Sequence, residues 1–361
     1  MKKLLTGNEA IAQGAWEAGV MYACAYPGTT STEILENIAE FKADIIAEWA
    51  PNEKVALETA AGASVFGARS LAAMKMVGVN VAADPLFSFA YAGVNGGMVL
   101  VSADDPGCHS SQDEQDNRYY AKFAKIAMVE PSDSQEAKDM VRAAMEISEQ
   151  YDTPVLMRIT TRICHSKSLV EIGPRQEVGK RPYVRDVNKY DLVPATARKR
   201  RVAVEKRVER LAEFSETTEL NFIEWNDKKI GIVASGVGYQ YAREVFGEAA
   251  SYLKLGFTFP LPINKIRDFA AQVGTLYVVE ELEPYIEEQL QAAGIACIGK
   301  AKVPGIGELT PDIIAKALKG ETIPLVEADP SQVVARPPLL CAGCPHRGFF
   351  YALTKYLNKS I

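Results

Sequence analysis

The stretch AMVEPSDSQEAKDMVRAAMEISEQYDTPVLMRI, residues 127–159, decides the fold of this chain. Residues 127–130 form a short apolar strand, residues 134–150 have the spacing of an amphipathic helix, and residues 154–159 form a second strand. Strands joined through a helix in this way lie parallel in one sheet, because the helix returns the chain to the edge where the first strand began. The stretch therefore predicts a parallel sheet that is covered by helices.

The same alternation of strands and helices runs through the earlier part of the chain. Helices are predicted at residues 6–19, 52–67 and 85–94. Strands are predicted at residues 21–26, 44–48, 71–76 and 97–102. We expect Ser31 or Thr32 to cap one further helix, in whose first turn the charge of Glu33 suits the helix dipole. The first half is thus an α/β domain whose parallel sheet is covered on both faces.

The composition changes after residue 172, and a second α/β unit begins at Lys229. Little apolar periodicity is present between residues 174 and 220 before Val202, which predicts a linker that leads into a charged helix. The second unit has predicted strands at residues 230–238 and 275–281 and a predicted helix at residues 286–293. The predicted segments are a first domain at 1–172, a linker at 173–228, a second domain at 229–325, and a connector with the start of a truncated domain at 326–361.

Composition excludes several classes of protein. The chain has 361 residues, of which 48% are hydrophobic and 24% charged, so it is not a wholly disordered chain. Its net charge of −6 argues against a dedicated nucleic-acid binder. The most apolar stretch, residues 76–103, is broken by polar residues and Pro85, so we expect no membrane span. Six largely scattered cysteines and the lack of a signal peptide predict a reducing, cytoplasmic location.

Two short motifs can each be interpreted either as a binding site or as ordinary local structure. Ser235–Gly238 suggests a dinucleotide-binding turn, but Tyr241 stands where the third glycine is needed, so a tight strand-to-helix turn is favoured. The basic run Arg198–Arg201 could contact nucleic acid, but in an acidic chain a solvated helix face is the favoured interpretation.

Three other stretches contain candidate functional residues. Residues 26–32, Tyr-Pro-Gly-Thr-Thr-Ser-Thr, follow a predicted strand and are either a ligand site or a helix cap. Glu58 stands at the head of the small residues 59–64, on a helix expected to be buried, where a carboxylate needs a partner and has a raised pKa. Taken alone, that stretch favours plain helix packing with Glu58 at an exposed rim. The polar loop 104–116 is a candidate wall of a site.

Cys341 and Cys344 form the chain's one Cys-x-x-Cys pair. They could provide half of a zinc or iron–sulfur site, but both kinds of site need four ligands and no cysteine follows Cys344. A redox dithiol is a further alternative, although it lacks the sequence context usual for one. We therefore expect the pair not to hold a stable cluster in this chain by itself.

In this order, the stretches 26–34, 104–124 and 341–347 resemble the α-subunit family of indolepyruvate ferredoxin oxidoreductases, in the thiamine-diphosphate-dependent 2-oxoacid:ferredoxin oxidoreductase superfamily. The resemblance covers essentially the whole chain. It implies an α/β fold with a pyrimidine-type thiamine-diphosphate-binding parallel-sheet domain followed by a transketolase-C-terminal-like α/β domain. The start of a diphosphate-binding domain is expected after it.

The resemblance also implies an activity with its cofactors and partners. The activity is ferredoxin-dependent oxidative decarboxylation of arylpyruvates to aryl-acyl-CoA, a step of amino-acid catabolism. The implied cofactors are thiamine diphosphate, Mg²⁺ and 4Fe-4S clusters. The implied partners are a β subunit, in a dimer of heterodimers, together with ferredoxin, coenzyme A and the arylpyruvate, and neither nucleic acid nor a membrane.

Individual roles follow from the same resemblance. Glu58 matches the glutamate that shares a proton with the cofactor's aminopyrimidine ring, which assists deprotonation of the thiazolium carbon. Pro27, Gly28 and Thr29 match the loop at the cofactor, and Thr29 matches a hydroxyl that faces the substrate. Cys341 and Cys344 would belong to an incomplete 4Fe-4S ligand set.

The sequence departs from the family pattern at two points. Pyruvate enzymes have an arginine just after the strand at 97–102 to hold the substrate carboxylate, where this chain has Asp104, so His109 and Arg118 are the candidate replacements. No Gly-Asp pair of the magnesium motif occurs, so we expect an N-terminal fragment that is inactive by itself. A pyruvate or 2-oxoglutarate enzyme and a non-catalytic partner subunit remain as alternatives. Glu58 argues against the non-catalytic subunit, because such a protein has no reason to bury an acid among alanines.

Overall fold

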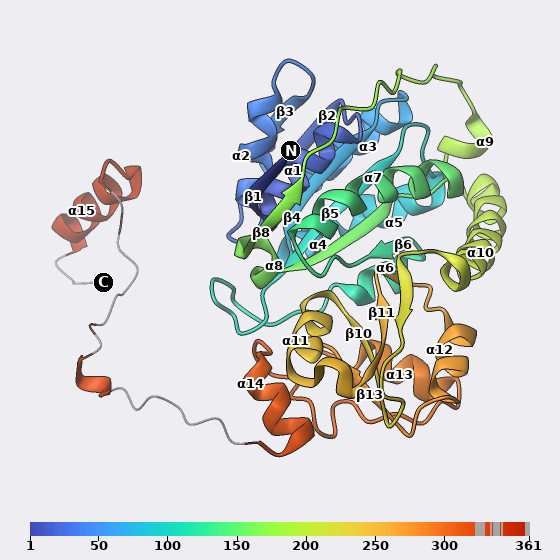
Figure 1. Cartoon of the computed structure of the whole chain (residues 1–361). Coiled ribbons are helices and arrows are strands. Elements are labelled where there is room, and N and C mark those ends of the chain that lie inside the picture. Colours follow the sequence, from blue (N-terminus) through green and yellow to red (C-terminus); the bar gives the residue numbers. More distant parts are fainter. Residues whose placement is uncertain (322–328, 333, 335–339, 341, 358–361) are drawn as a thin grey trace. The chain divides into compact units, whose positions relative to one another are not determined.

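The computed structural model describes residues 1–321, 329–332, 334, 340 and 342–357. Residues 1–322 form one compact unit and residues 323–361 form another. The first unit holds two α/β sheets, with the strands of residues 1–172 in blue to green and those of the later part in yellow to orange (Figure 1). In the second unit a helix, α15, covers Pro345–Leu357. Across the described residues, no helix combines the length and the apolar character that a membrane crossing requires.

The first sheet has seven strands in the order β12-β6-β7-β5-β4-β2-β3, and all neighbours except β12 and β6 are parallel. This confirms the predicted α/β fold with its parallel sheet. Every residue of β4, β5, β6 and β7 is buried, because helices cover both faces of the sheet. The strands are β2 (Tyr22–Ala25), β3 (Ile46–Trp49), β4 (Ser70–Lys75), β5 (Met98–Asp104), β6 (Ala127–Val129), β7 (Val155–Thr160) and β12 (Phe257–Phe259).

Helix ends in this domain follow local side-chain chemistry. Thr6 and Glu9 form a reciprocal capping box at the start of α1, and Asn52 and Asp133 cap α3 and α7. Ser31 stands at the N-cap position of α2, as predicted, but neither it nor Thr32 forms a side-chain cap, because both hydroxyls bond to the Gly28 carbonyl instead. The helices of this part are α1 (Gly7–Glu17), α2 (Thr32–Ile38), α3 (Glu53–Val65), α4 (Met76–Val81), α5 (Ala83–Ala92), α6 (Arg118–Ala124), α7 (Ser134–Tyr151) and α8 (Thr161–His165).

The second sheet has the strand order β13-β10-β11-β9, with β9 antiparallel at one edge. The turn predicted at Ser235–Gly238 is present, since Gly236 has a φ of +53° and begins α11 directly after β10. The strands are β9 (Asn221–Glu224), β10 (Ile230–Ser235), β11 (Ser251–Leu255) and β13 (Thr275–Val279). The helices are α9 (Val187–Tyr190), α10 (Pro194–Thr217), α11 (Gly236–Phe246), α12 (Ile263–Ala270), α13 (Tyr285–Ala292) and α14 (Pro311–Ile314).

Several strands lie where the sequence predicts none. β9 falls inside the segment 173–228 that the sequence predicts as linker, and β12 comes from the later part of the chain but adds an antiparallel edge to the first sheet. β1 (Lys2–Thr6) and β8 (Lys167–Glu171) pair as a separate two-stranded sheet. One hydrophobic cluster joins Leu57 and Met128 of the first domain to Leu253 and Phe269 of the second. The two sheets therefore share a core, which fixes their relative placement.

Candidate active site

The loop after β2 has a strained backbone. Thr30 has a φ of +101°, a region that β-branched residues rarely adopt. Its side chain is buried, and its Oγ1 is one of the buried polar atoms without a hydrogen-bond partner in the described part of the chain. Strain of this kind and an unsatisfied hydroxyl are typical of functional sites rather than of simple caps.

A pocket of about 370 Å³ opens beside this loop, at the carboxyl ends of β2, β5 and β7. It brings together Thr29 and His109, both of which the sequence predicts as substrate residues. One wall comes from the second domain, through Glu308. The remaining lining residues are Thr30, Ser110, Thr161, Arg162, His165 and Ser166. Carboxyl ends of parallel strands are where open α/β sheets bind ligands, so we take this pocket as the candidate site.

The wall that contains His109 is held by Asp105. Its carboxylate accepts hydrogen bonds from the Ser110 N–H at 2.8 Å, the Ser111 hydroxyl at 2.5 Å and the Thr161 hydroxyl at 2.7 Å. Although burial raises the pKa of Asp105, these hydrogen bonds outweigh that effect, and the pKa lies below its usual value. The carboxylate is therefore ionised at neutral pH and fixes the loop over the strand ends.

The basic side chains that line the pocket face carboxylates of this chain. Arg162 donates from Nε and Nη2 to the two oxygens of Glu308, both at 2.7 Å. His109 Nε2 lies 3.6 Å from Glu308 Oε2, and His165 Nε2 lies 3.9 Å from Glu33 Oε2. A bidentate arginine pair of this geometry is strongly oriented. Arg162 is thus engaged across the two domains.

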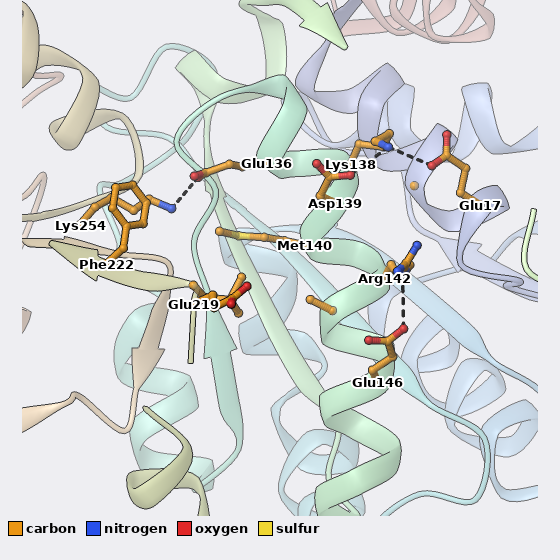
Figure 2. Close-up of a pocket in the computed structure, with 13 residues that line it drawn as sticks. Glu17, Glu136, Lys138, Asp139, Met140, Arg142, Glu146, Glu219, Phe222 and Lys254 are labelled. Carbon is orange, nitrogen blue, oxygen red and sulfur yellow. Dashed lines mark hydrogen bonds and ion pairs between the residues drawn. The ribbon is translucent and has the colours of Figure 1, made fainter. Parts of the chain in front are cut away.

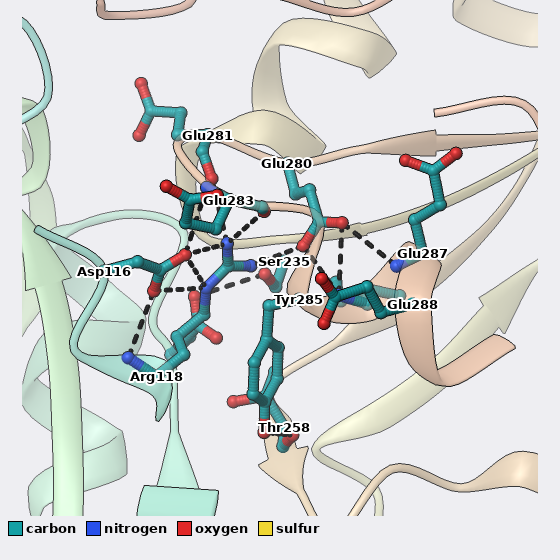
Figure 3. A network of polar contacts seen from close by, with 12 residues as sticks. Asp116, Arg118, Ser235, Thr258, Glu280, Glu281, Glu283, Tyr285, Glu287 and Glu288 are labelled. Atoms are coloured by element: carbon teal, nitrogen blue, oxygen red, sulfur yellow. Dashed lines mark hydrogen bonds and ion pairs between the residues drawn. The ribbon is translucent and has the colours of Figure 1, made fainter. Parts of the chain in front are cut away.

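Arg118 is wrongly predicted as a substrate residue. Its side chain is 0% exposed and lies in a buried polar network at the junction of the domains (Figure 3). Nη2 contacts Asp116 Oδ2 at 2.5 Å and Nη1 contacts Glu280 Oε2 at 2.7 Å. The carbonyls of Glu281 and Glu283 accept two further bonds from Nη2. With its donors satisfied inside the protein, this guanidinium cannot hold a substrate carboxylate.

Asp104, at the place of the expected arginine, does not reach the pocket either. It is fully buried, and Oδ2 accepts from Arg158 Nε at 2.8 Å and from the Asn117 N–H at 3.1 Å. Burial raises the pKa of Asp104 to about 7, although the neighbouring guanidinium opposes that rise. The residue belongs to the structural network between the domains.

Glu58 lies on the exposed face of α3 in this chain by itself, as the helix-packing interpretation expects, and the burial expected under the functional interpretation is wrong. Thr59 and Gly62 share that face, and an added Cβ at Gly62 would meet no atom within 4 Å. The buried face of α3, through Leu57 and Ala60, packs into the core. The face around Glu58 is thus open and carries a carboxylate, which fits the amino-substituted ring of thiamine diphosphate. The role of Glu58 stays a prediction.

The remaining predicted site residues do not line the pocket, and one of them lies outside the residues that the structure describes. Pro27 is exposed and Gly28 half-buried on the loop before Thr29. Cys341 lies outside the described residues, whereas Cys344 lies just before α15 with its Sγ 3.4 Å from His346 Nδ1. Among the described residues, no group of three or more His, Cys, Asp or Glu side chains is placed to hold a metal ion.

A different pocket, of about 380 Å³, lies between α7 and the strands β9 and β11 (Figure 2). Its basic side chains are paired with carboxylates around it. The pairs are Lys254 with Glu136 at 2.6 Å, Lys138 with Glu17 at 2.9 Å, and Arg142 with Glu146 at 3.4 Å. Because these charges are already balanced, we assign no ligand to this pocket.

Sequence reasoning missed Arg162, His165 and Glu308 of the candidate site. The first two follow β7 directly, so polar residues after a predicted parallel strand were the available signal. Glu308 comes from the second domain, and no local pattern indicates that it meets Arg162 of α8, 146 residues earlier.

The chain is similar in sequence to a known protein family and to several of its named members. Residues 13–226 match the model of the family described as "Pyruvate flavodoxin/ferredoxin oxidoreductase, thiamine diP-bdg". "Indolepyruvate oxidoreductase subunit IorA" of Archaeoglobus fulgidus is 41% identical over 99% of this chain and 62% of its own length. The protein of the same name from Methanothermobacter thermautotrophicus is 43% identical over 99% of this chain and 61% of its own length. The chain thus spans about three fifths of these relatives.

Solved structures resemble the fold at low sequence identity. The 2-oxoglutarate:ferredoxin oxidoreductase from Magnetococcus marinus, with 2-oxoglutarate, coenzyme A and succinyl-CoA bound, has a TM-score of 0.72 at 16% identity. The alignment covers 88% of this chain and 65% of that one. At this identity the likeness concerns the fold alone, and it agrees with a thiamine-diphosphate-binding domain followed by a transketolase-C-like domain.

Proposed function

Because this chain belongs to the pyruvate flavodoxin/ferredoxin oxidoreductase family of thiamine-diphosphate-binding proteins, we propose that it serves an enzyme that oxidatively decarboxylates arylpyruvates. In that reaction the 2-oxoacid loses carbon dioxide, two electrons pass to ferredoxin, and the acyl group is transferred to coenzyme A. The choice of arylpyruvates rests on the indolepyruvate oxidoreductase subunits at 41–43% identity.

The observation that carries this proposal is the pocket at the carboxyl ends of β2, β5 and β7. Thr29, Thr30 and His109 all line it. The backbone at Thr30, with its φ of +101°, is strained, and strain of this kind concentrates at functional sites. Hydroxyl and imidazole donors of this kind suit the keto and carboxylate oxygens of a 2-oxoacid.

Glu58 and the loop of Pro27, Gly28 and Thr29 would hold the aminopyrimidine side of thiamine diphosphate. Bound there, the cofactor would supply a carbanion that attacks the keto carbon and then stores the electrons of the acyl group. The carboxylate of Glu58 holds and returns a proton at the pyrimidine nitrogen, and the open face of α3 beside Gly62 gives the ring room to lie flat.

The other components of the enzyme are part of the same proposal. The relatives are named as subunits, which supports a multi-subunit assembly, and we propose a β subunit, a dimer of heterodimers, and ferredoxin as the electron acceptor. We also propose Mg²⁺ for the cofactor's diphosphate and 4Fe-4S clusters for electron transfer. Cys341 and Cys344 would be two cluster ligands, which remain to be tested together with the rest of the set.

The substrate assignment predicts a clear order of activities. We expect the assembled enzyme that contains this chain to reduce methyl viologen with indolepyruvate and coenzyme A faster than with pyruvate or 2-oxoglutarate. The measurement is kcat/KM for each 2-oxoacid under anaerobic conditions. A preference for pyruvate or 2-oxoglutarate would replace the arylpyruvate assignment, and no activity with any 2-oxoacid would refute the proposed function.

A further inference from the structure

Lys75 is a buried lysine that lacks a carboxylate partner. It ends β4, immediately before α4, and its side chain is buried, with the residue 8% exposed. Two other lysines are equally buried, Lys138 at 7% and Lys254 at 1%, and each of them forms an ion pair at 2.9 Å or less. Among the ion pairs of the described residues, none includes Lys75. Its Nζ donates a single hydrogen bond, to the Ser110 carbonyl.

Such a site is costly unless an anion completes it. Removing an ammonium group from water is unfavourable, and a nearby negative charge is the usual compensation. An ammonium group has three N–H donors, of which the Ser110 carbonyl takes one. Two donors are therefore left without a hydrogen-bond partner among the described residues.

Lys75 lies directly behind two walls of the candidate site. Ser110, its hydrogen-bond partner, lines the pocket. On the other side, a Cβ added to Gly28 would lie 3.1 Å from Cβ and 3.7 Å from Cδ of Lys75, so the loop before Thr29 packs against the lysine stem. A larger residue at position 28 would push that loop away from Lys75. Glycine thus brings the Thr29 loop and the lysine together.

The other cations near the site are already paired. Arg162 is bonded to both oxygens of Glu308, which also faces His109, and Arg118 is buried between Asp116 and Glu280. Lys75 is therefore the cation near the pocket whose charge the described residues leave without a carboxylate. Lys75 therefore has the positive charge needed to hold a substrate carboxylate, the role for which the sequence analysis names His109 and Arg118 as candidates.

We propose that Lys75 binds the carboxylate of the 2-oxoacid substrate in this site. The ammonium group keeps its bond to the Ser110 carbonyl and offers its free donors to the carboxylate, beside the loop before Thr29 that packs against its stem. This assignment rests on the proposed function, because it requires a substrate that is a 2-oxoacid.

The test compares an acid with its uncharged ester in the assembled enzyme. Indolepyruvate and its methyl ester share the ring and the ketone but differ in the negative charge. We expect Lys75→Met to raise KM for indolepyruvate by about 10- to 100-fold, the usual range for a charge-assisted hydrogen bond, with a smaller change in kcat. The inhibition constant of the methyl ester should stay within about twofold of wild type.

A stability measurement separates this role from a structural one. Lys138→Met is the matched control, because Lys138 is equally buried but paired with Glu17. We expect the temperature of thermal unfolding without substrate to fall for Lys138→Met and not to fall for Lys75→Met. Equal weakening of acid and ester, or an equal fall in unfolding temperature, would show that Lys75 only supports the Ser110 loop. Absence of 2-oxoacid turnover in the wild-type enzyme would instead refute the proposed function.

Discussion

Replacing Glu58 by glutamine should remove most of the turnover of the assembled enzyme, by about 10²–10⁴-fold, the usual contribution of general acid–base assistance. The amide can still form a hydrogen bond but cannot pass a proton to a pyrimidine nitrogen. Because Glu58 lies on the exposed face of α3, the change leaves the core contacts of Leu57 and Ala60 intact. The measurements are indolepyruvate-dependent viologen reduction and deuterium exchange at the thiazolium carbon of added cofactor.

The matched control is Glu53→Gln, which changes another carboxylate on the same helix, in its first turn. It should change both rates only slightly, because no role at the cofactor is assigned to Glu53. Turnover and exchange must slow together in Glu58→Gln, with an unchanged circular dichroism spectrum. If both rates remain close to wild type, Glu58 is a surface residue of α3 and its assignment is wrong.

Replacing Arg118 by methionine should lower the free energy of unfolding of this chain by about 3–5 kcal/mol. The guanidinium separates Asp116 in the first domain from Glu280 in the second, and its loss removes the direct ion-pair partner of two buried carboxylates (Figure 3). Burial raises the pKa of Glu280, whereas Arg118 lowers it, so the variant should retain a proton on Glu280 to a higher pH. Urea denaturation of the wild-type and variant chains measures the loss.

Arg142→Met is the control for this experiment. Arg142 pairs with Glu146 on the exposed surface of α7, at 3.4 Å, and such pairs contribute at most about 1 kcal/mol. The Arg118 variant should therefore be much less stable than the Arg142 variant. A loss of similar size in both would show that the buried network does not hold the two domains together.

Local sequence was enough to identify the α/β class of the fold and part of the site. Apolar runs and capping residues act over a few neighbouring positions, so β5, α1 and α7 were predictable within a few residues. Thr29 and His109 follow two different parallel strands, and carboxyl ends of such strands meet at one edge. Their shared pocket follows from that geometry.

The tertiary structure decided which charges are available to a ligand. Arg118 looked like a free cation, but Glu280, 162 positions later, neutralises it, and only packing of the two domains brings them together. Likewise β12 joins the first sheet from the second half of the chain. The residues next to Lys75 in the sequence do not indicate that its side chain is buried without a carboxylate partner. Burial and pairing depend on contacts between distant segments, which local periodicity does not encode, whereas helix and strand formation depends on near neighbours.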